Sequence, residues 1–270
     1  MKISEKEKKL LDIISKVDGA VVAFSGGVDS SLLAAIAEEL LGERALAVTA
    51  KSQTYPAWDN QDAERIADEI GINHIFLETK EFKNEKFVKN EKKRCYHCKK
   101  ELLRRLNEIR KDKGFEKILE GTNFTDRDDY RPGIEAVEEF GDVVISPLLE
   151  AELTKEEIRE LLRERNIPIA EKPSSPCLAS RIPFGSRIDR EKLERIESAE
   201  KFLRSRGFEV VRVRDHNGTA RIEVDERKIP ELMENRREIS KRLKEIGYKH
   251  VSIDLEGYRT GSLNPPETER

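Results

Sequence analysis

Residues 20–41, AVVAFSGGVDSSLLAAIAEELL, join an apolar run to a helical pattern through two adjacent glycines. Residues 20–24 are apolar and rich in valine, which favours a buried strand, and residues 30–41 carry apolar side chains at helical spacing. The glycines therefore lie where a strand ends and a helix begins. Free backbone N–H groups and the helix dipole attract anions at such a point, and glycine lets an anion approach the backbone closely. The stretch predicts a phosphate-binding loop.

The motif differs from two common phosphate-binding loops. It lacks the lysine of GxxxxGK[ST], and its glycine spacing is not GxGxxG. Hydroxyl groups are available from two serines, and Asp29 can cap the helix or help to position a magnesium ion. We predict that five loop residues bind phosphate: Ser25, Gly26, Gly27, Asp29 and Ser30. The alternative is a glycine turn followed by an ordinary helix cap.

Strand patterns alternate with helical patterns in the first part of the chain. The candidate strands span residues 20–24, 45–50, 74–79, 117–123 and 143–148. The candidate helices are SSLLAAIAEELL, NQDAERIADEIG and YHCKKELLRRLNEIRKDKG. Repeated alternation of this kind predicts the α/β class: a parallel sheet with helices on both faces, which binds nucleotide at the carboxyl ends of its strands.

The pattern changes after residues 172–188, a stretch rich in proline and serine. A helix, two strands, a second helix and a last strand are expected in residues 189–206, 208–214, 220–224, 229–246 and 249–255. They predict a small α+β domain. We place the boundary near residue 180, which gives a nucleotide-binding domain at 1–180 and a substrate or oligomerisation domain at 181–270.

Two further loops follow predicted strands. The segment LEGTNFTDRDD contains Gly121, Asn123 and Asp126, which we expect near the nucleotide because parallel strands present their carboxyl ends at one edge of the sheet. Ala50 or Lys51, at the end of the second strand, is expected to line the adenine and ribose pocket. The alternative for the first segment is a polar turn with no ligand.

Composition limits the partners. The 51 basic and 54 acidic residues nearly cancel, so no stable nucleic-acid partner is expected. No apolar run is long enough to cross a membrane, and the charged N-terminus does not resemble a signal peptide. We therefore expect a cytoplasmic protein without a membrane partner.

The three cysteines, Cys95, Cys98 and Cys177, form a C-x-x-C pair and a distant third thiol. Three thiolates can hold a [4Fe-4S] cluster and leave one iron open, and that iron could carry sulfide. Zinc held by the cysteines with His97 or another ligand is a second interpretation. A third is no metal at all, with a disulfide pair or a single reactive thiol.

Four segments, SGGVDSSLLA, RCYHCKKEL, EGTNFTD and PCLASRIPFG, together resemble the LarE family of ATP-dependent sulfur transferases, which are pyrophosphate-loop ATPases. The resemblance is most specific at CLASRIPFG. It implies an adenine nucleotide alpha hydrolase-like fold and an AMP-forming reaction that uses ATP and Mg²⁺. It also implies a substrate, pyridinium-3,5-biscarboxylic acid mononucleotide, whose carboxylate is adenylated and then converted to a thiocarboxylate for the nickel-pincer nucleotide cofactor.

The cysteines separate two branches of that family. In one branch a lone cysteine, which corresponds to Cys177, gives up its own sulfur and becomes dehydroalanine. Because this chain also has Cys95 and Cys98, it resembles the branch in which three cysteines hold a [4Fe-4S] cluster. Sulfide or another sulfur donor would then supply the sulfur. We expect Cys177, Asp29, Ser180 and Arg181 to take part in catalysis.

The small domain offers a charged sheet face. Strict alternation in VVRVRDH places Arg212 and Arg214 on the face opposite two valines. The resemblance associates these arginines with binding of the substrate phosphate and with subunit contacts, so we expect a homo-oligomer, and Arg181 is a third candidate for the phosphate. Arg221 and Glu223 lie on the charged face of the next strand, and the alternative is an exposed face with cross-strand ion pairs. Glu200 and Glu223 are candidates for a cation site at a subunit interface, and the alternative for them is an ordinary solvated charged face.

Two other functions remain open from the sequence. A tRNA thiolase of the same superfamily also combines a pyrophosphate loop with cysteines, but the chain has no obvious RNA-binding module. A non-catalytic nucleotide-binding protein stabilised by zinc is the other alternative.

Overall fold

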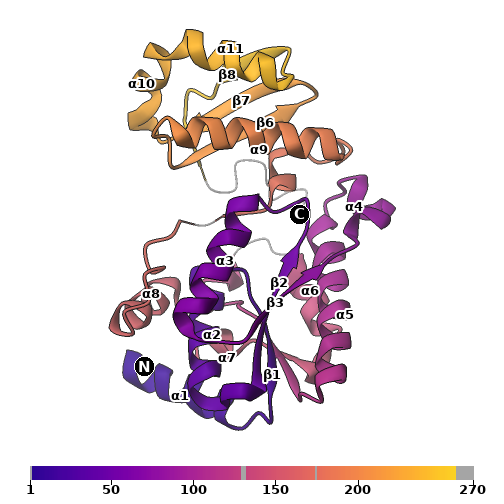
Figure 1. The fold of residues 1–270 in the computed structure, drawn as a ribbon, viewed down its shortest axis with the longest axis vertical. Coiled ribbons are helices and arrows are strands. Elements are labelled where there is room, and N and C mark those ends of the chain that lie inside the picture. Colours follow the sequence, from indigo (N-terminus) through magenta and orange to yellow (C-terminus); the bar gives the residue numbers. More distant parts are fainter. Residues whose placement is uncertain (1, 129–131, 174, 260–270) are drawn as a thin grey trace. The chain divides into compact units, whose positions relative to one another are not determined.

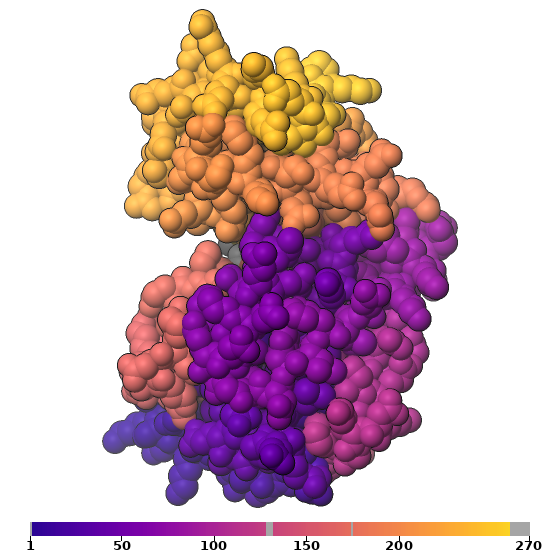
Figure 2. All heavy atoms as spheres, viewed as in Figure 1, coloured from indigo at the N-terminus to yellow at the C-terminus, as the bar shows by residue number. Residues whose placement is uncertain are grey.

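The computed structural model describes residues 2–128, 132–173 and 175–259, and it divides into two compact units. Unit 1 comprises Met1–Glu81 and Cys95–Ser175, and unit 2 comprises Phe82–Arg94 and Pro176–Arg270 (Figures 1 and 2). The division between Ser175 and Pro176 lies close to the boundary predicted at residue 180. The assignment of residues 82–94 to unit 2 was not predicted, because that segment lies between two elements of the first sheet.

Unit 1 is built on a five-stranded sheet in the order β3-β2-β1-β4-β5, and every neighbouring pair is parallel. The strands are β1 (Ala20–Ala23), β2 (Ala45–Lys51), β3 (His74–Glu78), β4 (Lys117–Leu119) and β5 (Val144–Ile145). The predicted parallel sheet is confirmed. Strands β4 and β5 end well before the predicted ends: β4 is followed by a polar loop, and β5 is followed, after Ser146, by the short helix α7.

Helices cover both faces of this sheet, as predicted. They are α1 (Ile3–Ser15), α2 (Val28–Leu41), α3 (Ala57–Ile70), α5 (Arg94–Lys113), α6 (Gly133–Glu138), α7 (Pro147–Glu150) and α8 (Lys155–Glu164). Successive residues of β1 point to opposite faces: Val22 packs with Leu32 and Ile36 of α2, whereas Val21 packs with Leu106 of α5. Burial of a leucine or isoleucine side chain contributes about 2 kcal/mol to folding. The hydrophobic clusters on the two faces of the sheet therefore hold the helices of each face against it.

Unit 2 contains a three-stranded sheet in the order β6-β7-β8. Its elements are α4 (Glu85–Val88), α9 (Arg190–Ser205), β6 (Val211–His216), β7 (Thr219–Val224), α10 (Ile229–Glu234), α11 (Arg236–Ile246) and β8 (His250–Ile253). Strands β6 and β7 are antiparallel, and β7 and β8 are parallel. The small α+β unit was predicted, but β6 begins and ends later than the predicted 208–214, because it runs up to a tight hairpin closed by Asn217 and Gly218, both with positive φ.

Short 3-10 helices complete the described elements: η1 (Gly42–Arg44), η2 (Glu81–Lys83), η3 (Phe124–Asp128), η4 (Gly141–Val143), η5 (Leu178–Arg181) and η6 (Glu226–Lys228). The predicted helix over 229–246 is two helices, α10 and α11, which meet at Asn235. In the part of the chain that the structure describes, no helix has the length and apolar character needed to cross a membrane.

Helix α8 was missing from the prediction, although its first turn has a clear start signal. The Thr154 side chain accepts a hydrogen bond from the Glu157 backbone, and the Glu157 carboxylate accepts one from the Thr154 N–H at 2.8 Å, which is a capping box. Lys6 of α1 donates to the same carboxylate at 2.8 Å. These contacts fix the start of α8, and with it Lys155.

We predict that Thr154→Ala lowers the free energy of unfolding by about 1 kcal/mol, because the mutant loses the hydroxyl that caps α8. Urea denaturation followed by circular dichroism measures the change. Thr154→Ser keeps the hydroxyl and should be nearly as stable as the parent chain. Equal destabilisation by serine and alanine would show that the threonine methyl group, and not the cap, matters.

Candidate nucleotide-binding site

The loop between β1 and α2 is shaped by Gly26. Its φ of +63° is accessible mainly to glycine, and a Cβ atom added there would lie 2.6 Å from the Cα of Ala63 in α3. Gly27 has φ −95° and forms the N-cap of α2. The loop is therefore pressed against α3, and its backbone leads directly into the free N–H groups of α2.

The two serines of the loop hydrogen-bond within it. The Ser25 N–H donates to Ser30 Oγ at 3.2 Å, and the two hydroxyl groups also lie 3.2 Å apart. Ser30 Oγ donates to the Gly27 carbonyl at 3.2 Å. These contacts hold the loop in one conformation without an external ligand.

Asp29 joins the loop to the segment after β4. Its Oδ1 accepts a hydrogen bond from Asn123 Nδ2 at 3.2 Å, and its Oδ2 lies 2.6 Å from Lys155 Nζ. Gly121 faces Asp29 so closely that an added Cβ would be 3.4 Å from the aspartate Cβ. Asp126 accepts a hydrogen bond from the Asn123 N–H at 3.1 Å, which fixes the backbone of this segment.

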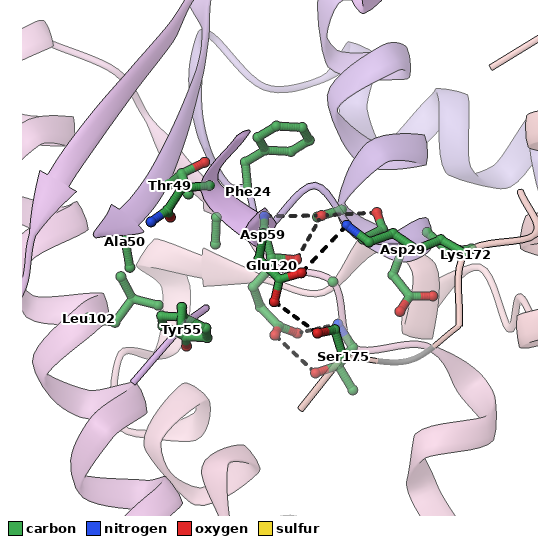
Figure 3. Close-up of a pocket in the computed structure, with 18 of the residues that line it drawn as sticks. Phe24, Asp29, Thr49, Ala50, Tyr55, Asp59, Leu102, Glu120, Lys172 and Ser175 are labelled. Carbon is green, nitrogen blue, oxygen red and sulfur yellow. Dashed lines mark hydrogen bonds and ion pairs between the residues drawn. The ribbon is translucent and has the colours of Figure 1, made fainter. Parts of the chain in front are cut away.

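A cavity of about 360 Å³ opens beside the loop (Figure 3). Of the predicted nucleotide-binding residues, six line it: Ser25, Gly27, Asp29, Ser30, Ala50 and Gly121. The other three predicted residues do not line the cavity. Gly26 shapes the loop, Asn123 holds Asp29, and Asp126 holds Asn123. Figure 3 places Asp29 and Lys172 toward one side of the pocket and Thr49, Ala50, Tyr55 and Leu102 toward the other. The pocket thus has a charged side beside the glycine loop and a less polar side beside β2.

The less polar side is held by a histidine in β3. His74 Nε2 and Thr49 Oγ1 are 2.8 Å apart, and the ring of Phe24 meets the His74 ring edge to face. Burial lowers the pKa of His74 and so disfavours its charged form. Lys51, the alternative to Ala50 in the prediction, is outside the pocket lining and lies over the Phe76 ring.

The sequence analysis missed three lysines and a glutamate that line the same pocket: Lys99, Lys155, Lys172 and Glu120. Glu120 is buried and accepts hydrogen bonds from Lys99 Nζ at 2.9 Å and from Ser146 and Thr122. Burial opposes ionisation of this carboxyl group, yet Lys99 and these hydrogen bonds hold the pKa of Glu120 below its ordinary value. The lysines come from segments far from the loop in sequence, so local spacing could not reveal them.

The three cysteines are divided between the two units. Cys95 is exposed and Cys98 is half-buried in the first turn of α5, in unit 1, whereas Cys177 is half-buried and precedes η5 in unit 2. Among the described residues, no three histidine, cysteine or acidic side chains are grouped so that they could hold a metal ion. The structure does not test the predicted cluster, whose ligands would come from both units.

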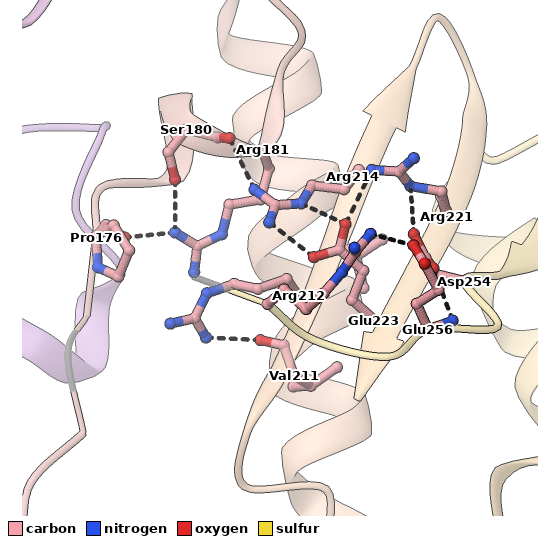
Figure 4. Close-up of polar contacts among 12 residues, drawn as sticks. Pro176, Ser180, Arg181, Val211, Arg212, Arg214, Arg221, Glu223, Asp254 and Glu256 are labelled. Carbon is pink, nitrogen blue, oxygen red and sulfur yellow. Dashed lines mark hydrogen bonds and ion pairs between the residues drawn. The ribbon is translucent and has the colours of Figure 1, made fainter. Parts of the chain in front are cut away.

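Arg181 follows Cys177 and is almost completely buried (Figure 4). It forms a two-pronged ion pair with Glu200, at 2.8 and 2.9 Å. Its remaining nitrogen donates to the carbonyl of Cys177 at 3.0 Å, to the carbonyl of Pro176 and to Ser180 Oγ at 3.1 Å. Burial opposes the charge of this guanidinium, but Glu200 outweighs that effect and raises the pKa of Arg181.

The charged face of β6 and β7 is largely buried and not exposed as the alternative had it, but it does carry the cross-strand ion pairs of that alternative. Arg214 binds Glu223 through two nitrogens at 2.9 and 2.7 Å and donates to the Ser180 carbonyl at 3.0 Å. Arg221 donates to the same glutamate at 2.9 Å. Arg212 lies over the Tyr258 ring, 4.9 Å from its centroid. Burial lowers the pKa of Arg212, and the neighbouring positive charge of Arg181 lowers it further.

We predict that Gly26→Ala lowers the free energy of unfolding by about 2 kcal/mol, because the new Cβ would have both an unfavourable φ and a clash with the α3 backbone. Gly27→Ala is the matched control. Its φ is negative and its added Cβ would meet only the Ser25 hydroxyl, so the loss should be about 1 kcal/mol or less. Equal losses, measured by urea denaturation, would contradict the close contact between the loop and α3.

Glu200→Gln should lower the free energy of unfolding by about 3 kcal/mol, because it leaves Arg181 buried beside a neutral group. Glu85→Gln is the control: Glu85 pairs with Arg187, both side chains are exposed, and the variant should melt like the parent. Chemical denaturation compares the two variants. If Glu200→Gln is as stable as the parent, the pair with Arg181 is not the main support of η5.

Comparisons with known proteins agree with this geometry. The NAD synthase family matches residues 3–204. An uncharacterised protein of Synechocystis, slr1717, is 38% identical over 97% of this chain and 98% of its own length. The pyridinium-3,5-bisthiocarboxylic acid mononucleotide synthase of Lactiplantibacillus plantarum is 33% identical over 99% of this chain and 96% of its own. An uncharacterised protein of Methanocaldococcus jannaschii, MJ0830, is 33% identical over 89% of this chain and 90% of its own.

The match to the synthase spans 99% of this chain, so it extends through both units and is not confined to the nucleotide-binding domain. The chain belongs to the pyrophosphate-loop ATPases and, within them, to the LarE family of ATP-dependent sulfur transferases.

Proposed function

We propose that this enzyme adenylates a carboxylate of pyridinium-3,5-biscarboxylic acid mononucleotide and converts it to a thiocarboxylate, for biosynthesis of the nickel-pincer nucleotide cofactor. The observation that carries the proposal is the pocket beside Gly26 and Gly27 in a chain that matches the synthase over 99% of its length. The charged side of the pocket suits a triphosphate, and the side beside Ala50 suits the adenosine.

In the first half-reaction, a carboxylate oxygen of the substrate bonds to the α-phosphorus of ATP, and the bond from that phosphorus to the bridging oxygen breaks. Pyrophosphate leaves, and the substrate becomes an acyl adenylate. The N–H groups at the start of α2 and the pocket lysines favour the negative charge that builds on the leaving group. Asp29 offers a hard oxygen ligand, so the residues fit a magnesium ion, which when bound would neutralise phosphate charge.

In the second half-reaction, a sulfur nucleophile attacks the acyl carbon and AMP leaves. With hydrosulfide, the products are the thiocarboxylate, AMP and one proton. We propose that Cys177 holds the carrier of this sulfur, with support from Ser180 and Arg181. Arg181 binds the Cys177 carbonyl and so fixes the backbone that carries the thiol.

We propose a [4Fe-4S] cluster on Cys95, Cys98 and Cys177 as the carrier of that sulfur. Three cysteine thiolates are a donor set that such a cluster takes, and the first two cysteines sit about one turn apart on α5. A bound cluster would supply an open iron for sulfide. The sacrificial use of Cys177 and a structural zinc ion are the competing possibilities.

We further propose that Arg212 and Arg214, with Arg181, bind the phosphate of the mononucleotide. Arg212 is buried beside another guanidinium, and an anion between them would relieve their repulsion. Arg214 is already held in a fixed orientation by Glu223, so it would present its outer N–H groups without loss of side-chain freedom.

The test uses enzyme purified without oxygen, with ATP, magnesium, sulfide and the biscarboxylic acid mononucleotide. We expect pyrophosphate release that depends on the mononucleotide, and a thiocarboxylate product seen by mass spectrometry. Pyrophosphate release that instead requires tRNA would favour the tRNA thiolase. No pyrophosphate release with any acceptor would favour a non-catalytic protein.

Alanine variants of the three cysteines separate the sulfur carriers. If the cluster delivers sulfur, each variant loses bound iron and thiocarboxylate formation while pyrophosphate release survives, because two thiolates hold the cluster too weakly. If the sulfur is sacrificial, only Cys177→Ala is inactive, and the parent enzyme accumulates dehydroalanine at that position. Zinc-loaded protein whose variants retain sulfur transfer but melt earlier would indicate a structural metal site.

A further inference from the structure

Three lysine–carboxylate pairs neutralise the charged part of the pocket. Lys99 pairs with Glu120 at 2.9 Å, Lys155 with Asp29 at 2.6 Å and Lys172 with Asp62 at 2.8 Å. A triphosphate needs positive charge, and each of these ammonium groups already has a carboxylate partner. At least one pair must therefore open or be shared when the polyanion binds.

The pair that costs least to open is the one whose carboxylate water can reach most easily. The Glu120 side chain is 1% exposed and would become a buried, unpaired charge. Asp29 is 24% exposed and is also held by Asn123. Asp62 is 36% exposed, so water can replace Lys172 with little loss. Because Asp62 is the most exposed of the three carboxylates, the pair between Lys172 and Asp62 is the one we expect to open.

Lys172 also lies at the correct place. Its Nζ donates to the carbonyl of Gly26, in the phosphate-binding loop, at 3.3 Å, and it lines the cavity together with Ser25 and Gly27. A second carboxylate, Asp59, lies 3.8 Å away. The side chain of Lys172 is a flexible chain of four carbons. Its ammonium group can therefore turn from α3 toward the loop without a backbone movement.

We propose that Lys172 is the pyrophosphate-binding lysine of this enzyme, and that Asp62 and Asp59 hold its ammonium group until the nucleotide arrives. The inference rests on the proposed ATP site. When the β- and γ-phosphates occupy the loop, Nζ leaves Asp62 and donates to phosphate oxygens. Lys155 keeps its contact with Asp29. Lys172 then distinguishes ATP and pyrophosphate from AMP, which has no group at that position.

The test measures binding of inorganic pyrophosphate and of AMP separately, with magnesium present, by isothermal titration calorimetry. Lys172→Gln should weaken pyrophosphate binding about tenfold, because it removes one charge-assisted hydrogen bond. The AMP affinity should stay unchanged. Lys172→Arg, which keeps the charge, should restore most of the pyrophosphate affinity.

Asp62→Asn provides the distinguishing result. It removes the competitor for the ammonium group, so it should strengthen pyrophosphate binding, and the double variant with Lys172→Gln should behave like Lys172→Gln alone. If Lys172 and Asp62 only stabilise the fold, both single variants weaken pyrophosphate and AMP binding together. That outcome, or unchanged pyrophosphate affinity in Lys172→Gln, would overturn the inference.

Arg165→Gln is the matched control. Arg165 also forms a partly buried ion pair, 2.6 Å from Glu7, but both residues are outside the pocket lining, and its loss should not change pyrophosphate affinity. Thermal melting confirms that each variant is folded. A parent enzyme that binds neither AMP nor pyrophosphate would overturn the ATP site itself and this inference with it, whereas normal ATP turnover in Lys172→Gln would overturn only the inference.

Discussion

The contact between Gly26 and α3 is the constraint on which the nucleotide site depends. An added Cβ at Gly26 would lie 2.6 Å from the Ala63 Cα, so only glycine lets the loop reach that helix. The same contact brings the carboxylates of Asp59 and Asp62, on the first turns of α3, beside the loop. Lys172 can therefore contact the Gly26 carbonyl and Asp62 at once. One backbone position thus sets both the shape of the phosphate site and its charge.

The absence of a lysine from SGGVDS has a consequence for how this pocket handles charge. In a phosphate-binding loop that contains its own lysine, the ammonium group and the backbone N–H groups that bind phosphate belong to the same segment. Here the cations come from α5, from the start of α8 and from the segment that leaves unit 1, and each is paired with a carboxylate. The pocket is therefore close to neutral when empty, and its attraction for a polyanion depends on which pairs can open.

Local sequence pattern identified the sheet, the loop and the second polar segment, because parallel strands bring their carboxyl ends to one edge whatever the packing details are. Asn123 therefore reaches Asp29, although 94 residues separate them. Lys155 and Lys172 carry no such signal, because neither follows a predicted strand. The charged face of β6 was assigned to the correct side of the strand, but its burial depends on the residues packed over it, which alternation alone cannot indicate.

The buried ion pairs of unit 2 are better explained by positioning than by stability. Removing two opposite charges from water costs several kcal/mol per ion, and their attraction often only offsets that cost. What the pair of Arg181 and Glu200 provides is a fixed guanidinium that binds the carbonyls of Pro176 and Cys177, in a segment that has no sheet to support it. Arg214 adds a bond to the Ser180 carbonyl. Cys177 therefore sits on backbone that is fixed by charge. The first proposed half-reaction depends on the ATP site of unit 1, whereas the second needs Cys177 of unit 2 together with Cys95 and Cys98 of unit 1. Because the chain passes between the units at three points, after Glu81, Arg94 and Ser175, the sulfur step is the one that requires both units.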